Sequence, residues 1–368
     1  MRVIALLGRR DEPTDGVADY CSFLAQALQR HNVELEIVHV PWADLGWRGA
    51  MRWLSRESRN WVGQWVLLQY TAMAWSRRGL PFRVLAVERM LLKRGVKCAV
   101  VFHDVILDPL PGFHNRIRRK IQYWIMACLL ARATQGISTV APDELRWPHS
   151  ARGKLVFIPI GANIPDAVPE SAGEKSFTPL GQPKTIGVYC ISGGNYRQRE
   201  DKEIIFVVDK AKARVPELQL EFFGRGTEEA ASLLEEPLRK LAVKYRLRDV
   251  LPAEEITRTL KSLDAFLCVR GEMSPNRGSA LAAIACGIPI IAFGKPGRHS
   301  ELDAAGIEFA PWGSLNSLAD AAIRVLTDAT LWQELHEKNR RAHAEIFSWD
   351  AVAARYAVIL DSLGTPTE

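Results

Sequence analysis

The sequence predicts an α/β protein made of two doubly wound domains, each with a mostly parallel sheet that helices cover on both faces. Three observations support this prediction. The chain has 368 residues, which is too long for one ordinary core. Short apolar strands alternate with helical patterns through both halves, as is typical of parallel sheets. A segment rich in Pro, Gly, Ser and charge at 166–183 has the composition of a linker between the halves.

Each half alternates predicted strands with predicted helices. In the first half we expect strands at 2–8, 33–40, 65–70, 97–105 and 154–161, and helices at 15–32, 80–95 and 117–135. In the second half we expect strands at 184–192, 218–224, 249–252, 265–271 and 288–294. The expected helices there lie at 202–216, 228–245, 256–264, 279–286, 317–328, 330–347 and 349–363. Ligands of such sheets bind at the carboxyl ends of the strands.

The composition excludes several classes of protein. No apolar run approaches the roughly 18–20 residues that a membrane-spanning helix needs. The opening strand at 2–8 is too short, and too soon followed by charge, to be a signal peptide, so we expect a cytoplasmic protein. The six cysteines are widely spaced, without a CxxC pair, and mostly lie in apolar stretches. This spacing predicts small buried side chains rather than a zinc site.

The net charge of +6 is unevenly distributed. Residues 1–165 contain 23 Lys and Arg against 13 Asp and Glu, a net charge of +10, and the remaining residues carry −4. Such asymmetry bears on partners rather than on fold. A nucleic acid, an anionic lipid or a phosphorylated substrate would each fit it, but no nucleic-acid-binding motif is present, so we expect no nucleic-acid partner.

Several short motifs follow one another along the chain. In order they are DGVADYCSFLAQAL, VVFHD, VFIPIGANIP, SGGNYRQREDK, ITRTLKSLDAFLCV with ACGIPIIAF, and FSWDAVAARY. Their order and spacing resemble those of the GT-B glycosyltransferases, and within them the retaining glycosyltransferase family four, over nearly the whole chain. The resemblance implies two Rossmann-like domains that face each other across a cleft. It places an acceptor domain at 1–170, a nucleotide-sugar domain at 180–347, and a helix at 348–368 that crosses back to the first domain.

The stretch GEMSPNRGSALAAIACG, residues 271–287, joins a Gly-rich turn to a helix of small residues. The family that it resembles usually has two glutamates here, eight residues apart, and the second receives the ribose hydroxyls of the donor. This chain has Ser274 and Ala282 at those positions. It is similar instead to a subset of the family with a Ser-x-Arg-Arg-Gly-Ser type of loop. Glu272 and Glu301 are the candidates for the missing carboxylate's role, although neither is in register.

This helix start suits a diphosphate. A helix N-terminus offers free N–H groups and about half a positive charge, and a guanidinium adds a planar charged donor. The donor-binding residues predicted on this loop are Glu272, Ser274, Asn276, Arg277, Gly278 and Ser279. The alternative is an ordinary capped helix with Ser279 near the N-cap.

Cationic residues follow the first strand of the second half. In the family, an Arg and a Lys five residues apart neutralise the leaving diphosphate here, which stabilises charge that grows as the bond breaks. Arg197 and Lys202 match that spacing and are the predicted catalytic pair, and Arg199 is a competing candidate for the same role. The alternative is a solvated, charged loop.

The first half offers its own candidates at strand ends. Gly16 is predicted to bind the donor, because it allows close approach of a phosphate or sugar to the backbone, unless it is a plain turn. His103 ends an apolar strand, with Asp104 beside it. A neutral histidine in a cleft can hydrogen-bond the sugar or orient the acceptor, and we predict a catalytic role for it. A buried structural histidine is the alternative. Gln69 and Tyr70, which also end a strand, and Asp104 are weaker candidates for the acceptor side.

We expect neither a metal nor another cofactor, since no Asp-x-Asp motif occurs and the resemblance implies that cationic side chains do a metal's work.

The acceptor side carries a basic, aromatic surface. The stretch 41–66 contains five Trp and four Arg. A second stretch brings together Arg116, Arg118, Arg119, Lys120, Tyr123 and Trp124. Such a pattern predicts contact with the inner surface of a membrane, or else a solvated basic face over a Trp core.

The leading hypothesis from the sequence is a metal-independent, retaining hexosyltransferase. It would move a sugar from a nucleotide-sugar donor to a glycan or a lipid-linked glycan. A sugar-nucleotide epimerase is a second candidate, but we find no clear set of acidic catalytic residues for it. A non-catalytic binding protein, derived from a transferase, is the third. Ala282 favours this third hypothesis, whereas Arg197, Lys202, Gly16 and His103 argue against it.

Overall fold

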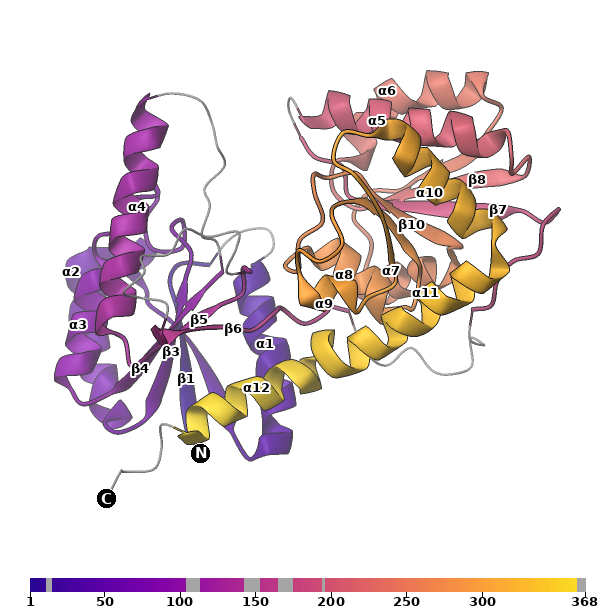
Figure 1. The fold of residues 1–368 in the computed structure, drawn as a ribbon. Helices are drawn as coiled ribbons and strands as arrows, with labels where there is room; N and C mark the ends of the chain where they lie inside the picture. The colour runs from indigo at the N-terminus through magenta and orange to yellow at the C-terminus, as the bar shows by residue number, and fades with distance from the viewer. Residues whose placement is uncertain (11–14, 104–112, 142–152, 165–174, 194–195, 363–368) are drawn as a thin grey trace. The chain divides into compact units, whose positions relative to one another are not determined.

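The computed structural model describes residues 1–10, 15–103, 113–141, 153–164, 175–193 and 196–362 (Figure 1). Asp104 lies outside these ranges. The chain divides into two compact units. The first unit consists of Met1–Gly161 and Trp349–Glu368, and the second of Ala162–Ser348. We describe each unit by itself.

The first unit is built on a six-stranded parallel sheet with the strand order β2-β1-β3-β4-β5-β6. The strands are β1 Arg2–Leu7, β2 Glu34–His39, β3 Trp65–Tyr70, β4 Lys97–Phe102, β5 Gln135–Ser138 and β6 Leu155–Phe157. The helices are α1 Gly16–Leu28, α2 Trp42–Glu57, α3 Val84–Lys93, α4 Phe113–Arg132 and α12 Trp349–Ser362. Alternate residues of each strand face opposite sides. Thus Val3 and Ala5 pack toward α1 and α12, whereas Ile4 and Leu6 pack toward α2, α3 and α4.

The last helix, α12, completes the core of the first unit. Trp349 is 4% exposed and packs edge-on against Tyr20, with ring centroids 5.0 Å apart, and parallel to Phe23 at 5.6 Å. A side chain at Gly161 would start 2.6 Å from the Trp349 indole, so only glycine fits there. Two turns of α12 further on, the hydroxyls of Tyr20 and Tyr356 share a buried hydrogen bond of 2.8 Å. The C-terminal helix therefore covers the face of the sheet that α1 leaves open.

The second unit has its own six-stranded parallel sheet, with the order β12-β11-β10-β7-β8-β9. The strands are β7 Lys184–Tyr189, β8 Leu218–Phe223, β9 Lys244–Leu247, β10 Ala265–Cys268, β11 Ile290–Phe293 and β12 Ile307–Ala310. The helices are α5 Arg197–Lys212, α6 Thr227–Lys240, α7 Ala253–Ser262, α8 Gly278–Ala285, α9 Ser300–Asp303, α10 Leu315–Thr327 and α11 Ala329–Ala342. A π-helical turn, His343–Phe347, ends the unit.

Three details of the second unit differ from the sequence-based expectation. The helix expected at 228–245 ends at Lys240, because Ala242 has a positive φ of 50° and turns the chain into β9. The strand expected at 249–252 is absent, since the edge strand is formed by the preceding residues, Lys244–Leu247. The sequence also missed β12, whose four residues are too few for a clear period-2 pattern.

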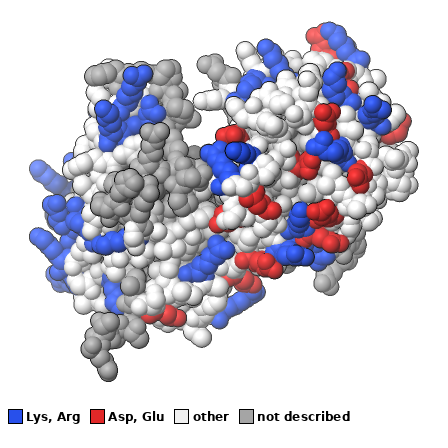
Figure 2. Space-filling model, in the orientation of Figure 1, with Lys and Arg blue, Asp and Glu red and all other residues white. Residues whose placement is uncertain are grey.

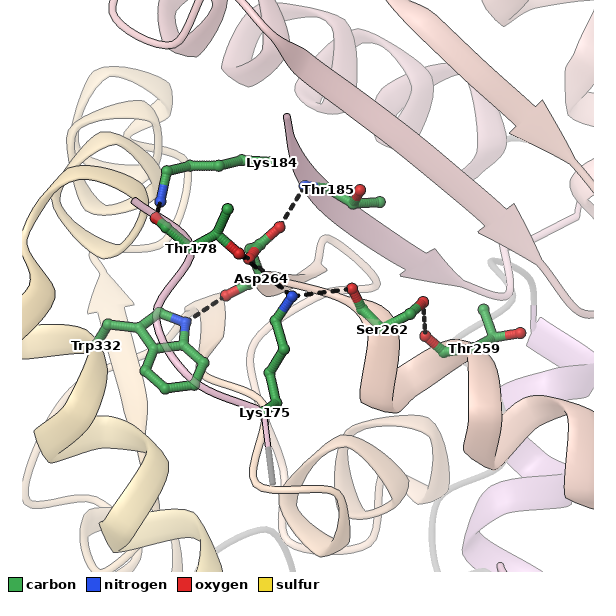
Figure 3. A network of polar contacts seen from close by, with 8 residues as sticks. All are labelled: Lys175, Thr178, Lys184, Thr185, Thr259, Ser262, Asp264 and Trp332. Atoms are coloured by element: carbon green, nitrogen blue, oxygen red, sulfur yellow. Dashed lines mark hydrogen bonds and ion pairs between the residues drawn. The ribbon is translucent and has the colours of Figure 1, made fainter. Parts of the chain in front are cut away.

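A polar network fixes the start of the second unit to its sheet (Figure 3). The Asp264 carboxylate accepts hydrogen bonds from the backbone N–H of Thr185, at 2.7 Å, and from the Thr178 hydroxyl. It also forms an ion pair of 3.1 Å with Lys175. The Trp332 indole N–H donates to the Asp264 carbonyl at 2.7 Å. Asp264 thus joins the segment before β7 and the strand itself through its carboxylate, and α11 through its backbone carbonyl.

Candidate functional site

The strand order of the second unit places a topological switch point between β7 and β10. From β7 the chain proceeds outward to β8 and β9, then returns to β10 on the other side of β7 and continues to β11 and β12. In open parallel sheets, ligands bind where the strand order reverses, outside the carboxyl ends of the strands. The loops that follow β7 and β10 therefore form the candidate site. They contain most of the residues that the sequence analysis selected for a nucleotide sugar.

The loop after β10 is held by its own side chains. The Arg277 guanidinium donates to the Glu272 carbonyl at 3.2 Å, and the Glu272 carboxylate pairs with Arg298 at 2.7 Å. The Ser274 hydroxyl donates to the Asn276 side-chain oxygen at 2.6 Å. Arg277 is the N-cap residue of α8, without a side-chain capping bond. The loop thus presents one guanidinium at the start of a helix.

Helix α8 itself is packed against the unit's core. Its small residues Ala280, Ala282 and Ala283 are buried, with Ala282 3% exposed. A side chain built at Gly278 would meet nothing within 4 Å, so open space adjoins the first residue of the helix. Ser279 follows it in the same first turn. The expected helix-terminal geometry is present, and the position of the usual ribose-binding glutamate is occupied by a buried methyl group.

The three cationic candidates after β7 lie on the first two turns of α5 but reach different surroundings. Arg199 donates to the carbonyl of Val269, just after β10, at 3.4 Å, and its guanidinium lies 5.0 Å from the centre of the Trp312 ring. Arg197 instead approaches Glu229 of α6 at 3.5 Å. Lys202 lines a groove between α5 and α6. Of the three, Arg199 is the one in contact with the end of β10.

Two further residues of this site were missed by the sequence analysis. Arg270, directly after β10, donates to the Ser192 hydroxyl at 3.3 Å and so joins the two loops of the switch point. Glu200 is 1% exposed and accepts the backbone N–H of Ser192 at 2.7 Å. The position of Arg270 immediately after an apolar strand was a usable signal for the first of these. A buried glutamate on a charged helix turn leaves no such signal.

In the first unit, His103 follows β4 and lies against β3 and α1. Its Nε2 and the Gln69 side-chain oxygen are 2.7 Å apart, and its ring packs edge-on to Tyr20 at 4.8 Å. Burial lowers the pKa of His103 to about 4, and Asp15 opposes this shift. The imidazole is therefore neutral at pH 7 and donates its Nε2 proton to Gln69.

The other first-unit candidates lie at the same edge of the sheet. The Asp15 carboxylate caps α1 by accepting the backbone N–H groups of Val17 and Ala18, at 3.1 and 3.0 Å. Gly16 is the first residue of α1, and a side chain built on it would meet nothing within 4 Å. Tyr70 is fully buried in the core, and burial raises the pKa of its hydroxyl.

The low pKa of His103 predicts that the stability of the folded protein depends on pH. The unfolded chain protonates this histidine near pH 6.5, whereas the folded chain does so only near pH 4. Because the unfolded state binds the extra proton first, stability is lost as the pH falls through this window. Between pH 7 and 4.5 the free energy of unfolding should therefore fall by about 2 kcal/mol less in His103→Asn than in the unsubstituted protein. Urea unfolding at both pH values measures this difference. His31→Asn, an exposed control, should leave the loss unchanged, and equal losses in both variants would contradict this assignment.

Lys and Arg side chains of the first unit gather over α2 and α3 (Figure 2), and aromatic side chains lie among them. A groove of about 730 Å³ there is lined by Trp47, Arg48, Met51, Arg52, Arg83 and Ala86. The Arg83 guanidinium lies 5.7 Å from the centre of the Trp47 ring, which stacks in turn on Trp42 at 5.2 Å. Trp42 is buried in the core, whereas the arginines are exposed. The arginines thus form an exposed basic face beside a Trp that belongs to the core, and the predicted membrane contact stays a prediction.

Among the residues of the described ranges, no three His, Cys, Asp or Glu side chains gather in a way that could hold a metal ion. Within the same ranges, no helix combines the length and the apolar character that crossing a bilayer requires.

No protein-family model matches the sequence, and no curated protein matches it. Solved structures match nearly the whole chain. HepE of Anabaena in complex with UDP and glucose is 14% identical, with a TM-score of 0.62, over 98% of this chain and 100% of its own. The sucrose-phosphate synthase of Thermosynechococcus elongatus is 17% identical, with a TM-score of 0.66, over 99% of both chains. The lipopolysaccharide outer core galactosyltransferase WaaB is 12% identical, with a TM-score of 0.62, over 99% and 100%. These matches confirm the GT-B fold that the sequence predicted.

Proposed function

We propose that this chain, which has the GT-B fold, is a metal-independent, retaining glycosyltransferase of the family-four type. It moves a hexose from a nucleotide-sugar donor to a glycan or lipid-linked glycan. The observation that carries the proposal is the gathering of Arg199, Arg270 and Arg277 around the switch point, beside the start of α8. Arg199 also pairs with Glu203 of its own helix, at 3.3 Å, but no dianion among the described residues contacts all three groups. A diphosphate supplies such a dianion, and the solved neighbours crystallised with UDP are similar in fold.

The chemistry follows from where charge develops. As the bond between the anomeric carbon and the diphosphate oxygen breaks, its electron pair moves to the leaving diphosphate. Fixed guanidinium groups and free helix N–H groups stabilise that growing charge without reorganising. The acceptor hydroxyl forms the new bond to the anomeric carbon and releases a proton. We assign donor binding to Arg199, Arg277, Gly278 and Ser279, with Arg197 and Lys202 as the alternative cationic pair.

In the first unit, we assign the acceptor side to the edge formed by Gly16, Gln69 and His103. A neutral imidazole both donates and accepts hydrogen bonds, so His103 suits a sugar hydroxyl better than a phosphate. Its hydrogen bond to Gln69 orients the ring. This assignment expects His103→Ala to weaken acceptor use more than nucleotide binding.

A panel of nucleotides tests the proposal. Thermal unfolding is measured with UDP, GDP, ADP, TDP and CMP at saturating concentrations. A ligand at a hundredfold excess over its Kd stabilises the folded state by about 2.7 kcal/mol, so one nucleotide should stand out clearly. Transfer is then assayed with the corresponding nucleotide sugars and no added metal. A flat response to the whole panel would overturn the proposal.

One observation favours a second candidate, a binding protein without transferase activity. Ala282 offers the ribose no carboxylate, and its methyl group is 3% exposed. This candidate predicts that a nucleotide stabilises the protein, while neither transfer nor hydrolysis of the nucleotide sugar occurs. The same two measurements therefore separate the candidates.

We further propose that the protein is cytoplasmic and that the groove of Arg48, Arg52 and Arg83 rests on an anionic membrane. The three guanidinium groups are exposed, and none pairs with a carboxylate in the described part of the chain. Each such residue contributes about 1 kcal/mol near an anionic surface. The protein should sediment together with vesicles that contain phosphatidylglycerol, whereas the variant Arg48→Glu, Arg52→Glu should stay in solution. Equal binding to neutral vesicles would contradict this contact.

A further inference from the structure

A second cavity lies on the second unit, between α5 and α6. It has a volume of about 630 Å³, which is within the range of small-molecule sites. Its walls are mostly apolar and include Ile205, Phe206, Leu233, Pro237 and Leu241. Leu233 is 44% exposed, although it is a large apolar side chain. The groove runs along the two helices and involves none of the loop residues after β10.

One acidic side chain that lines this groove has no hydrogen-bond partner. Asp201 lines the groove and is only 4% exposed, yet neither of its carboxylate oxygens has a hydrogen-bond partner. Arg197, one turn earlier on α5, is directed to Glu229 instead. Burial raises the pKa of Asp201 to about 6, partly opposed by the charge of Arg197. A buried carboxylate without a donor is costly, and native structures rarely retain one without a reason.

We propose that this groove binds a small molecule with a primary ammonium group on an apolar body. The ammonium pairs with Asp201, and the hydrocarbon lies on Phe206, Leu233 and Pro237. A carboxylate only accepts hydrogen bonds, so the ligand must bring the donors, and a cation also supplies the charge that Asp201 lacks. The long side chains of Gln198 and Lys202 line the same groove and are exposed, so the ligand would enter beside them.

The probe is 4-phenylbutylamine, compared with 4-phenylbutanol and 4-phenylbutyrate, which have similar apolar bodies and different head groups. Calorimetric titration should show one saturable site for the amine, and weaker binding of the alcohol and the acid. Asp201→Asn keeps the shape of the side chain and removes its charge, so the affinity for the amine should fall about tenfold or more. The same substitution should leave the affinity for the alcohol unchanged. Asp320→Asn, an exposed acid on α10, should change neither.

Two outcomes would overturn the proposal. One is an amine that binds no better than the alcohol, and the other is an Asp201→Asn variant with undiminished amine affinity. We expect Asp201→Asn to fold, since it removes an unmatched charge, and its melting temperature checks this directly. Leu233→Arg, at an exposed position, gives an independent test because its side chain fills the groove. It should abolish amine binding and leave any nucleotide-induced stabilisation intact, and retained amine binding would exclude the groove.

Discussion

Arg199→Ala is expected to lower nucleotide-sugar turnover by about 10² to 10³-fold, the loss typical of removing one fixed donor to developing charge. Arg199 is the cationic candidate of α5 that contacts the end of β10, and the Trp312 ring beneath it holds its guanidinium in place. The side chain is therefore preorganised. Since the leaving diphosphate carries more charge in the transition state than in the bound donor, kcat should fall more than KM rises.

Initial rates at varied donor concentration check this expectation, with circular dichroism to confirm the fold. Arg214→Ala is the matched control, because Arg214 is an exposed arginine just beyond the far end of α5. The comparison with Arg197→Ala and Lys202→Ala decides which cations face the diphosphate. If those two variants lose turnover and Arg199→Ala does not, the assignment to Arg199 is wrong and the alternative pair holds.

Trp349→Ala should destabilise the first unit by about 3–5 kcal/mol, the usual cost of removing a large buried aromatic side chain. The indole is 4% exposed, and it fills the space between Tyr20, Phe23 and the bare backbone of Gly161. None of these groups can close the resulting cavity, because Gly161 has no side chain and both rings are held by α1. The hydrogen bond between Tyr20 and Tyr356 next to it should weaken as well.

Urea unfolding of the first unit measures this loss of stability. Trp124→Ala is the control, since Trp124 is 55% exposed on α4, and surface substitutions usually change stability by less than about 0.5 kcal/mol. A Trp349→Ala variant as stable as Trp124→Ala would show that α12 does not complete this core.

The sequence by itself determined the division into two parallel sheets and the order of most of their elements, although it missed the short strands β5 and β12. These follow from local properties, because apolar runs, helical spacing and Gly or Pro breaks are visible within windows of about ten to twenty residues. The strands at 65–70 and the helix start near Gly16 are examples of accurate boundaries. The predicted GT-B fold followed from the same order of elements together with the motifs.

Only the tertiary structure decided which side chains share a surface. Arg197 and Lys202 are five positions apart, which separates them by about 140° around a helix. Their spacing alone could not show that one meets α6 and the other lines a groove, while Arg199 reaches β10. The unmatched carboxylate of Asp201 and the loop contact of Arg270 were hidden for the same reason. A side chain's direction relative to neighbours distant in the chain depends on packing, which no local pattern of residues encodes.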